Sequence, residues 1–288
     1  MAYPKVTSPW TRIIDYPENH LNDFCLFRGP DHRWHAIGIM GTGTWASETS
    51  LFHCSSADLY GHYTQHTPLL AALSRGNTRN AAPQKHAPFV LVRNGTCFMF
   101  LRRPWGTNLR LTSTDTFHWS DPPDVVFEEK DARDACIQHF GGFYCWYYCQ
   151  WQEVDGKGRS CILLRRSRDL EHWDDPVTIH VDTSREVKHS QLESPFVVRA
   201  TGSYWLFVRN RTLDVDCVTT VFRSDAADSF ASGEKVWDAE LPGIHAAELV
   251  RAKGQWYIAR VSGPPDSYPR APRTGGWVEI ARVAFPGA

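Results

Sequence analysis

A short motif recurs along the chain, and this recurrence constrains the fold more than any other feature. The pattern S-x-D-x-x-H-W occurs at 113–119 (STDTFHW) and at 167–173 (SRDLEHW). Looser versions begin at Ser56 (SADLYGHY) and Ser224 (SDAADSF). A period of about 50 residues is the signature of a repeat architecture in which each unit is one supersecondary structure. We therefore expect the 288-residue chain to be built from similar units, although its length alone also allows two domains.

Each unit also contains an apolar run, a short turn and an aromatic-rich run. Turns such as Asn94-Gly95 and Gly141-Gly142 are of the kind that β-hairpins require. Residues alternate after these turns, so that Phe143, Cys145 and Tyr147 would share one face of a strand. The hairpins predicted in this way are 22–40, 85–101, 132–148, 192–208 and 244–261.

Units of three to four strands are too small to be separate domains, so they must stack on one another to bury both faces. Radial stacking of five units predicts an all-β fold, a single five-bladed β-propeller spanning 1–288 with a central pocket. A two-sheet sandwich is the alternative, and the regularity of the repeats favours the propeller. The N-terminal segment, with Val6 to Ile14, is expected to close the ring against the last blade. The expected blades are about 20–65, 84–128, 132–182, 190–240 and 243–288.

Charge and hydropathy exclude several classes of partner. The net charge is −1 and no basic stripe occurs, which argues against nucleic acid. No apolar run approaches the roughly 18 residues of a membrane span, which argues against a membrane. The start MAYPKVTSPW lacks the pattern of a signal peptide. We expect a cytoplasmic protein, or a secreted or periplasmic one whose leader has been removed, and the sequence gives no indication of oligomeric state.

The eight cysteines show no CxxC pair. Cys145 and Cys149 would face the same side of a strand, but a zinc site needs a compact set of four ligands. Buried free thiols are favoured over disulfides or a metal site, which agrees with a reducing compartment.

In a propeller the innermost strand of every blade lines the central channel, so residues at its start converge at one mouth. Aligning the units on their apolar runs predicts that each blade contributes polar residues to this mouth. In blade order these residues are Asp23, His86, Arg133 with Asp134, Glu193 and His245.

Three carboxylates around one pocket suit the cleavage of a glycosidic bond. One must stay protonated to donate to the leaving oxygen, and a second must be ionised to activate water or attack the anomeric carbon. A third can hold the pKa values of the other two apart. Asp23, Asp134 and Glu193 are the candidates. The pattern predicts a small carbohydrate as the ligand, and the aromatic content of 13% provides faces on which sugars could stack.

The residues at these positions also resemble a known group of enzymes. The segments His20–Phe24 (HLNDF), Arg133–Ala135 (RDA) and Glu193–Phe196 (ESPF) are similar to the three-motif signature of five-bladed propeller glycoside hydrolases of families 32 and 43. The resemblance implies that Asp23 is the catalytic base or nucleophile, Asp134 the pKa-modulating acid and Glu193 the general acid. Phe24 and Ala135 replace the prolines usual after the two aspartates, as expected of a divergent member.

The resemblance implies a hydrolase of furanosides (arabinofuranosides or fructofuranosides) or of xylosides. An axial pocket closed by loops at one mouth favours an exo-acting enzyme that releases single sugars, whereas an open groove would allow internal cleavage. Asn22-Asp23 and Arg133-Asp134 are closer to family 32, whereas Glu193-Ser194-Pro195 is closer to family 43. Retention and inversion of configuration both stay open. A propeller-type glycoside phosphorylase and a non-catalytic sugar-binding propeller are the alternatives.

Further residues are candidates for substrate binding. His86 and Arg133 suit sugar hydroxyls or carboxylates, and Arg133 could equally form a salt bridge with a catalytic carboxylate. No cofactor is required, but His245 resembles the axial histidine that binds a cation, often calcium, in many family 43 enzymes; a hydrogen-bonded channel histidine is the alternative. The remaining candidates are His20 and Asn22 in the first motif, and Trp34 and Trp105 as sugar platforms or packing residues.

Overall fold

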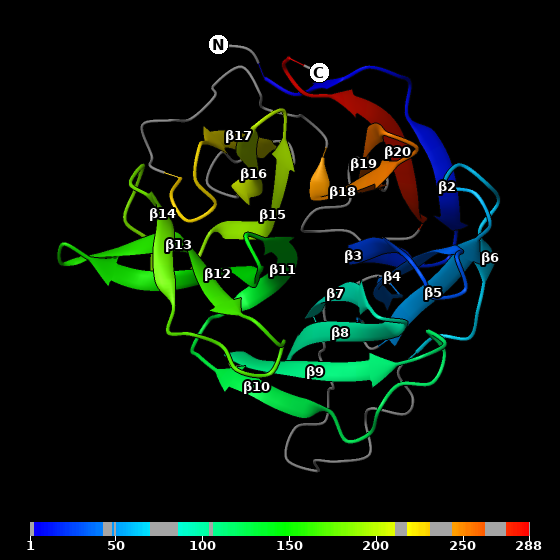
Figure 1. Cartoon of the computed structure of the whole chain (residues 1–288), viewed down its shortest axis with the longest axis horizontal. Helices are drawn as coiled ribbons and strands as arrows, with labels where there is room; N and C mark the ends of the chain where they lie inside the picture. The colour runs from blue at the N-terminus through cyan, green and yellow to red at the C-terminus, as the bar shows by residue number, and fades with distance from the viewer. Residues whose placement is uncertain are drawn as a thin grey trace.

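The structure is a computed structural model that describes residues 3–42, 48, 50–69, 86–103, 106–210, 218–230, 244–262 and 275–287. Its strands form five antiparallel sheets arranged around a common axis (Figure 1). The described residues contain no α-helix. The predicted all-β, five-bladed propeller is therefore confirmed.

Each blade runs from an inner strand at the axis to outer strands at the rim. Blade 1 contains β3 (His20–Arg28), β4 (Trp34–Gly41), β5 (Ser50–Ser56) and β6 (Thr64–Gln65). Blade 2 contains β7 (His86–Arg93), β8 (Thr96–Arg103), β9 (Thr107–Ser113) and β10 (Asp124–Glu128). Blade 3 contains β11 (Arg133–Phe140), β12 (Phe143–Val154), β13 (Lys157–Ser167) and β14 (Val177–Asp182). Blade 4 contains β15 (Leu192–Ala200), β16 (Ser203–Asn210) and β17 (Thr219–Ser224).

Both ends of the chain build blade 5. Its inner strands β18 (His245–Ala252) and β19 (Gln255–Ser262) are followed by β20 (Gly276–Ala284). The N-terminal strands β1 (Lys5–Val6) and β2 (Thr11–Tyr16) both pair with β20. Around the axis, β3 contacts β7 on one side and β18 on the other (Figure 1). The ring is thus closed by β-sheet hydrogen bonds between the first and last segments of the chain.

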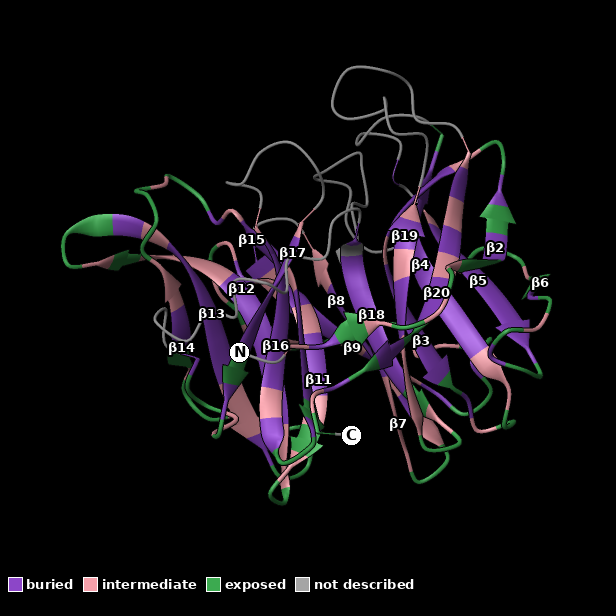
Figure 2. Cartoon of the chain, turned by 90° about the horizontal axis from the view of Figure 1, so that it is seen from above, coloured by how far each residue is buried: buried purple, intermediate pink, exposed green. Residues whose placement is uncertain are grey.

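The core lies between the faces of neighbouring blades. Trp146 in β12 is fully buried and meets Phe100 of blade 2 edge to face, with ring centroids 4.9 Å apart. Trp173 of the repeated motif packs against Trp146 at 5.1 Å. In Figure 2 the central strands are mostly buried along their length, while exposed residues gather at turns. The motif tryptophans Trp119 and Trp173 therefore serve blade packing, as the repeat predicts.

The rest of the motif forms a turn at the rim of blades 2 and 3. The Asp115 carboxylate accepts hydrogen bonds from the backbone N–H groups of Phe117 and His118, at 2.9 and 2.8 Å, and contacts the His118 ring. Asp169 and His172 repeat this arrangement in blade 3. A side chain that caps its own turn in this way stabilises the connection between two strands. The S-x-D-x-x-H-W motif therefore has a structural role, in which it stabilises the turn between two strands.

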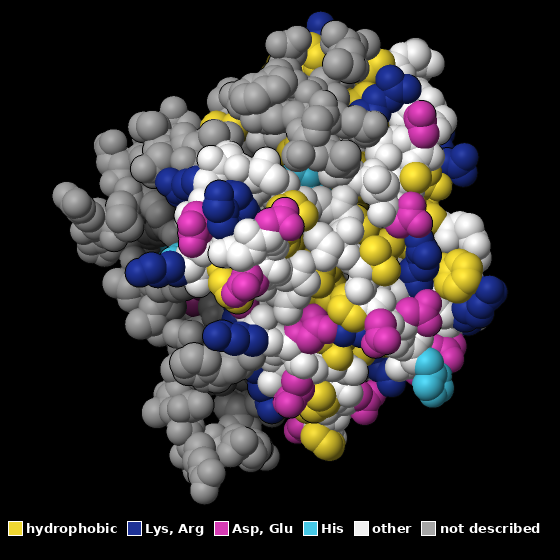
Figure 3. Space-filling model, turned by 90° about the vertical axis from the view of Figure 1, so that its left-hand side faces the viewer, with side chains coloured by type: hydrophobic (Ala, Val, Ile, Leu, Met, Phe, Trp, Pro, Cys, Tyr) yellow, Lys and Arg dark blue, Asp and Glu magenta, His cyan; other side chains and the backbone are white. Residues whose placement is uncertain are grey.

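The cysteines agree with the sequence-based expectation where the structure describes them. The seven described cysteines are buried and free, and Cys217 lies outside the described residues. On the face in Figure 3, Lys and Arg side chains are interspersed with Asp and Glu. Within the described parts of the chain, no helix has the length and apolarity needed to span a membrane.

Candidate active site

The inner strand of every blade has an irregular register close to its start. The pairing shifts between Leu21 and Phe24 in β3, and at the corresponding places in β7, β11, β15 and β18. In four of the blades a non-glycine residue within this bulge has a left-handed backbone; these are Ala87 (φ 48°), Asp134 (φ 62°), Ser194 (φ 48°) and Ala246 (φ 50°). Bulges of this kind redirect side chains at a sheet edge, and a left-handed non-glycine residue is strained. The end of the propeller that carries these bulges is called the mouth below.

The register corrects one detail of the alignment by sequence. In β15, Glu193 is the last paired residue before the bulge, and Leu21 is its counterpart in β3. Asp23 therefore does not hold the place of Glu193, but lies later in its bulge, between Leu21 and Phe24. The alignment of apolar runs missed this offset because a bulge adds residues that a simple strand repeat does not count.

The structure brings Asp23, Asp134 and Ser194 into direct contact. The Ser194 hydroxyl donates to Oδ1 of Asp23 at 3.0 Å, and the Ser194 backbone N–H donates to Oδ2 of Asp134 at 3.1 Å. Glu193 precedes Ser194 in the chain, so carboxyl groups from blades 1, 3 and 4 meet at the mouth. Asp134 and Glu193 are buried, while Asp23 is half-buried.

Two arginines hold the Glu193 carboxylate. Nη1 of Arg133 lies 3.0 Å from Oε1, and Nη1 of Arg209 lies 2.7 Å from Oε2. Arg133 also donates from Nη2 to the carbonyl oxygens of Ser190 and Leu192, at 2.9 and 3.1 Å. Charge-assisted pairs of this kind favour the ionised carboxylate. Arg133 was expected either to bind substrate or to form a salt bridge with a catalytic carboxylate, and the structure contains this salt bridge.

Asp134 lies in a different electrostatic environment. Its burial raises its pKa to about 6, and the negative charges of Asp23 and Glu193 act in the same direction. The guanidinium of Arg133 and the hydrogen bond from Ser194 oppose this shift. Neighbouring carboxyls with such unlike surroundings are the arrangement that acid–base catalysis needs near neutral pH.

His20 and Asn22 contact a carboxylate that the sequence did not single out. His20 Nε2 lies 3.0 Å from Oε1 of Glu48, and the Asn22 amide donates to the same oxygen at 3.3 Å. All three side chains are buried. The first motif is thus tied to the segment between β4 and β5. No local pattern marks Glu48, because its contacts with His20 and Asn22 join residues 28 and 26 positions apart in the chain.

Trp34 lies away from the mouth. It pairs with Arg28 at the end of β3, whereas His20 at the start of β3 pairs with Gly41. Since antiparallel neighbours run in opposite directions, Trp34 is at the far end of blade 1 from Asp23, where it packs against the core. Trp34 therefore lies apart from the three acids, and its contacts favour the packing interpretation over the sugar platform.

The remaining predicted residues are described only in part. His86 and His245 begin the inner strands β7 and β18, but their side chains lie outside the described residues, as does Trp105. Among described residues, no group of three or more His, Cys, Asp or Glu side chains is arranged to hold a metal ion. A cation beside His245 stays a prediction.

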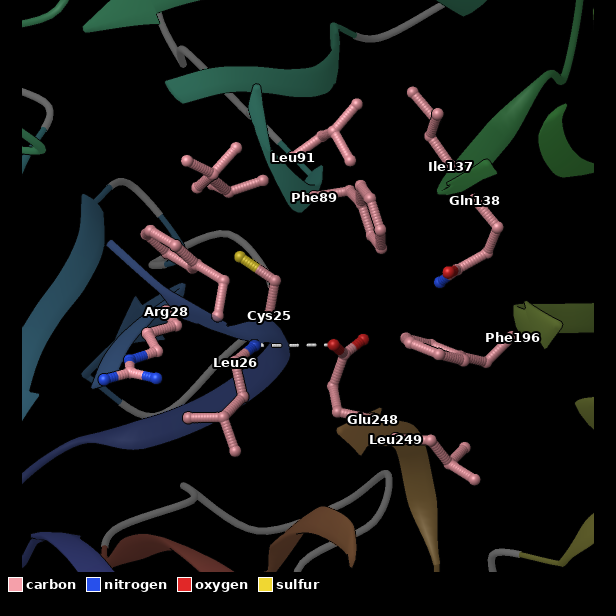
Figure 4. Close-up of a pocket in the computed structure, with 13 residues that line it drawn as sticks. Cys25, Leu26, Arg28, Phe89, Leu91, Ile137, Gln138, Phe196, Glu248 and Leu249 are labelled. Carbon is pink, nitrogen blue, oxygen red and sulfur yellow. Dashed lines mark hydrogen bonds between the residues drawn. The ribbon is translucent and has the colours of Figure 1, made fainter. Parts of the chain in front are cut away.

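Below the mouth, all five inner strands line an axial cavity of about 200 Å³. Glu248 of β18 projects into it and accepts a hydrogen bond from the Leu26 N–H at 3.4 Å, facing Gln138, Phe89 and Phe196 (Figure 4). Burial raises the pKa of Glu248 well above its usual value, and the charge of Asp23 adds to this. The sequence contains a sign of this fourth acid, because a glutamate interrupts the apolar run HAAELV. Glu248 is the first paired residue after the bulge in β18, where β7 and β15 have phenylalanine.

Ser194 and Arg209 were also missed as functional candidates. Ser194 appeared only as part of a motif, and Arg209 follows an apolar run in β16 with no motif of its own. Strand pairing offers a signal for Arg209, because it lies directly opposite Glu193.

Comparison with known proteins gives a close match in fold and little in sequence. No protein-family model matches the chain. An uncharacterized protein of Mycobacterium tuberculosis is 31% identical over 110 residues, which are 35% of this chain and 36% of that protein. The chain thus spans about a third of the length of this curated relative.

Solved structures match over nearly the whole chain. A thermostable family 43 glycoside hydrolase has a TM-score of 0.70 at 16% identity, covering 93% of this chain and 91% of the other. An α-L-arabinanase mutant of Cellvibrio cellulosa has a TM-score of 0.68 at 14% identity, covering 93% of both chains. A family 43 enzyme of Xanthomonas citri in complex with xylotriose has a TM-score of 0.63 at 13% identity, covering 95% and 91%. The chain therefore has the five-bladed propeller fold of these family 43 glycoside hydrolases.

Proposed function

We propose that this protein is a glycoside hydrolase whose active site is the mouth of the propeller. The observation that carries the proposal is the meeting of three carboxyl groups from three blades, with Ser194 bonded to both Asp23 and Asp134 and adjacent to Glu193. The fold shared with family 43 glycoside hydrolases supports the same chemistry.

In this proposal, Asp23 is the base or nucleophile. It is the least buried of the three acids, and the hydroxyl of Ser194 stabilises its ionised form. Asp134 binds substrate and tunes its neighbours, since its raised pKa and central position couple it to both other carboxyls. Glu193 donates the proton to the leaving oxygen. Because two arginines favour its ionised form, the proposal requires that a bound sugar weaken one of these ion pairs.

The proposed substrate is a small furanoside or xyloside cleaved at its non-reducing end. Release of a single sugar is proposed because the three acids converge at the starts of the inner strands β3, β11 and β15, around the axis. Support for these sugar classes comes from neighbours that are described as an arabinanase and as an enzyme in complex with xylotriose.

The test is hydrolysis of nitrophenyl α-L-arabinofuranoside, β-D-xyloside and β-D-fructofuranoside by the wild-type chain and two variants. We expect Asp23→Asn and Glu193→Gln each to lower kcat/KM at least about 1,000-fold, because each removes a group that takes part in bond cleavage. Unchanged melting temperatures would separate this loss from unfolding. Full activity in either variant would refute the assignment.

The same screen, repeated with inorganic phosphate, distinguishes the alternatives. Strictly phosphate-dependent turnover would indicate a glycoside phosphorylase. Sugar binding without turnover under both conditions would indicate a binding propeller. The hydrolase is favoured over the phosphorylase because Arg133 and Arg209 are already paired with Glu193, and three carboxylates repel an anion.

A further inference from the structure

We propose that Ser194 is a positioning residue that holds the catalytic carboxylate of Asp23 from the opposite side of the axis. The catalytic consequence rests on the function proposed above, whereas the effect on Asp23 itself does not. Ser194 has not been assigned any role by its motif, in which Glu193 carries the chemistry.

The hydrogen bond from Ser194 to Asp23 joins two blades that are not neighbours in the ring. Blade 1 contacts blades 2 and 5 through its inner strand β3, and blade 4 contacts blades 3 and 5 through β15. The 3.0 Å bond between the Ser194 hydroxyl and Oδ1 of Asp23 therefore crosses the mouth of the channel. Closure of the ring brings the two bulges close together, and the Ser194 hydroxyl spans the remaining gap to Asp23.

The backbone of Ser194 makes this geometry specific. Its left-handed conformation, with φ 48°, directs the N–H to Oδ2 of Asp134 at 3.1 Å while the side chain reaches Asp23. The same left-handed bulge position is occupied by Ala87 in blade 2 and by Ala246 in blade 5. The bulge is thus a general feature of these blades, whereas the hydroxyl is a particular feature of blade 4. A hydroxyl at this place connects the two aspartates through one residue.

The chemical effect follows from the state of the acceptor. A hydroxyl that donates to a carboxylate stabilises the ionised form and restricts its orientation. A base or nucleophile must be ionised and correctly oriented before substrate arrives. Removal of the hydroxyl should therefore raise the pKa of Asp23 and lower kcat, while the Ser194 N–H bond to Asp134 persists.

The experiment uses Ser194→Ala, which removes only the hydroxyl, and Ser194→Gly, which also relieves the left-handed strain and protects against misfolding. Ser203→Ala is the matched control, since Ser203 is a buried serine of the same blade that accepts a hydrogen bond from Arg223 at 3.0 Å. Aspartate labelled with ¹³C at its carboxyl group allows titration by NMR, with Asp23→Asn identifying the Asp23 signal.

We expect the Asp23 titration midpoint to rise by about one pH unit in both Ser194 variants and to stay unchanged in Ser203→Ala. The midpoint of the acidic limb of the pH profile of kcat/KM should move to higher pH by the same amount, and kcat should be about tenfold lower. An unchanged Asp23 midpoint would overturn the proposal even in an active enzyme. A shifted midpoint in a protein that hydrolyses no glycoside would instead refute the proposed function and leave the positioning of Asp23 intact.

Discussion

Two polar clusters lie at opposite ends of the propeller and differ in residue type and role. The mouth cluster consists of Asp23, Asp134, Glu193, Arg133 and Arg209, bridged by Ser194. The histidine cluster consists of Asp31, His35, His53, His66 and Thr116. It lies between blades 1 and 2 at the far end of blade 1, since His35 pairs with Phe27 near the end of β3.

The histidine cluster is held together by short contacts and ring stacking. His35 Nε2 lies 3.0 Å from Oδ1 of Asp31, and His35 Nδ1 lies 3.0 Å from His53 Nε2. The His35 and His53 rings stack with centroids 5.3 Å apart, and Phe117 of blade 2 closes over His53 at 4.9 Å. Both histidines are fully buried. Burial lowers the pKa values of His35 and His53, so the two rings are neutral near pH 7.

The difference between the clusters is one of charge. At the mouth, full charges lie close together, and the carboxyl groups are tied to arginines and to a hydroxyl across the axis. At the far end, neutral rings fill an interface between two blades. Charged groups held beside a pocket suit catalysis, while neutral stacked rings suit packing. A count of histidines in the sequence does not separate these roles, because burial and partners decide them.

Loss of Arg209 is expected to disrupt the mouth cluster. Arg209→Met keeps an unbranched aliphatic side chain but removes the guanidinium and its ion pair with Glu193. We expect kcat/KM to fall about 100-fold because Glu193 loses its orientation. The free energy of unfolding should fall by about 2 kcal/mol, since Arg133 still neutralises part of the buried charge of Glu193. Steady-state kinetics and urea unfolding measure both effects.

The control for this prediction is Arg223→Met, on the neighbouring strand of the same blade, where Arg223 donates to Ser203. It should leave kcat/KM within about twofold, because a surface polar contact contributes little. Equal losses in the two variants would contradict a special role for the Arg209–Glu193 pair.

Acid should weaken the histidine cluster. Burial, together with the charges of His35 and His66, lowers the pKa of His53 to about 3 from an ordinary value of 6.5. Below pH 6.5 the unfolded chain takes up a proton that the folded chain excludes, so the stabilisation present above pH 6.5 is lost as the pH falls toward 3. One such proton corresponds to about 1.4 kcal/mol per pH unit, or about 2 kcal/mol by roughly pH 5.

The measurement is urea unfolding between pH 7 and 5 for wild type and His53→Phe, which keeps an aromatic ring but cannot titrate. His53→Phe should cost about 1 kcal/mol at pH 7 through the lost hydrogen bond, and its stability should fall less steeply with acid. His62→Gln, at an exposed site outside the histidine cluster, serves as the control. Parallel pH profiles for wild type and His53→Phe would show that His53 is not the group responsible.

Substitution of Trp34 has the smallest expected effect on activity and stability. It tests whether Trp34 lies at the end of the propeller opposite the mouth. Since Trp34 packs into the core at the far end of blade 1, Trp34→Phe should change kcat/KM by less than about twofold and lower unfolding free energy by about 1 kcal/mol. A large rise in KM with an unchanged melting temperature would instead indicate that Trp34 contacts the sugar.

The sequence by itself determined the repeat, the hairpins and the blade-packing role of Trp119 and Trp173. These features are local, because a strand period, a turn and a capping aspartate are encoded within a few neighbouring residues. It also identified Asp23, Asp134 and Glu193 as acids at the starts of inner strands, since a propeller brings such starts to one mouth.

Only the tertiary structure decided which side chains join these acids. The bond from Ser194 to Asp23, the contacts of Glu48 with His20 and Asn22, and the pairing of Arg209 with Glu193 depend on bulges and on closure of the ring. The far-end position of Trp34 depends on strand direction. Such contacts join residues that are distant in the chain, and the physical reason that no local pattern predicts them is that long-range packing sets their distances.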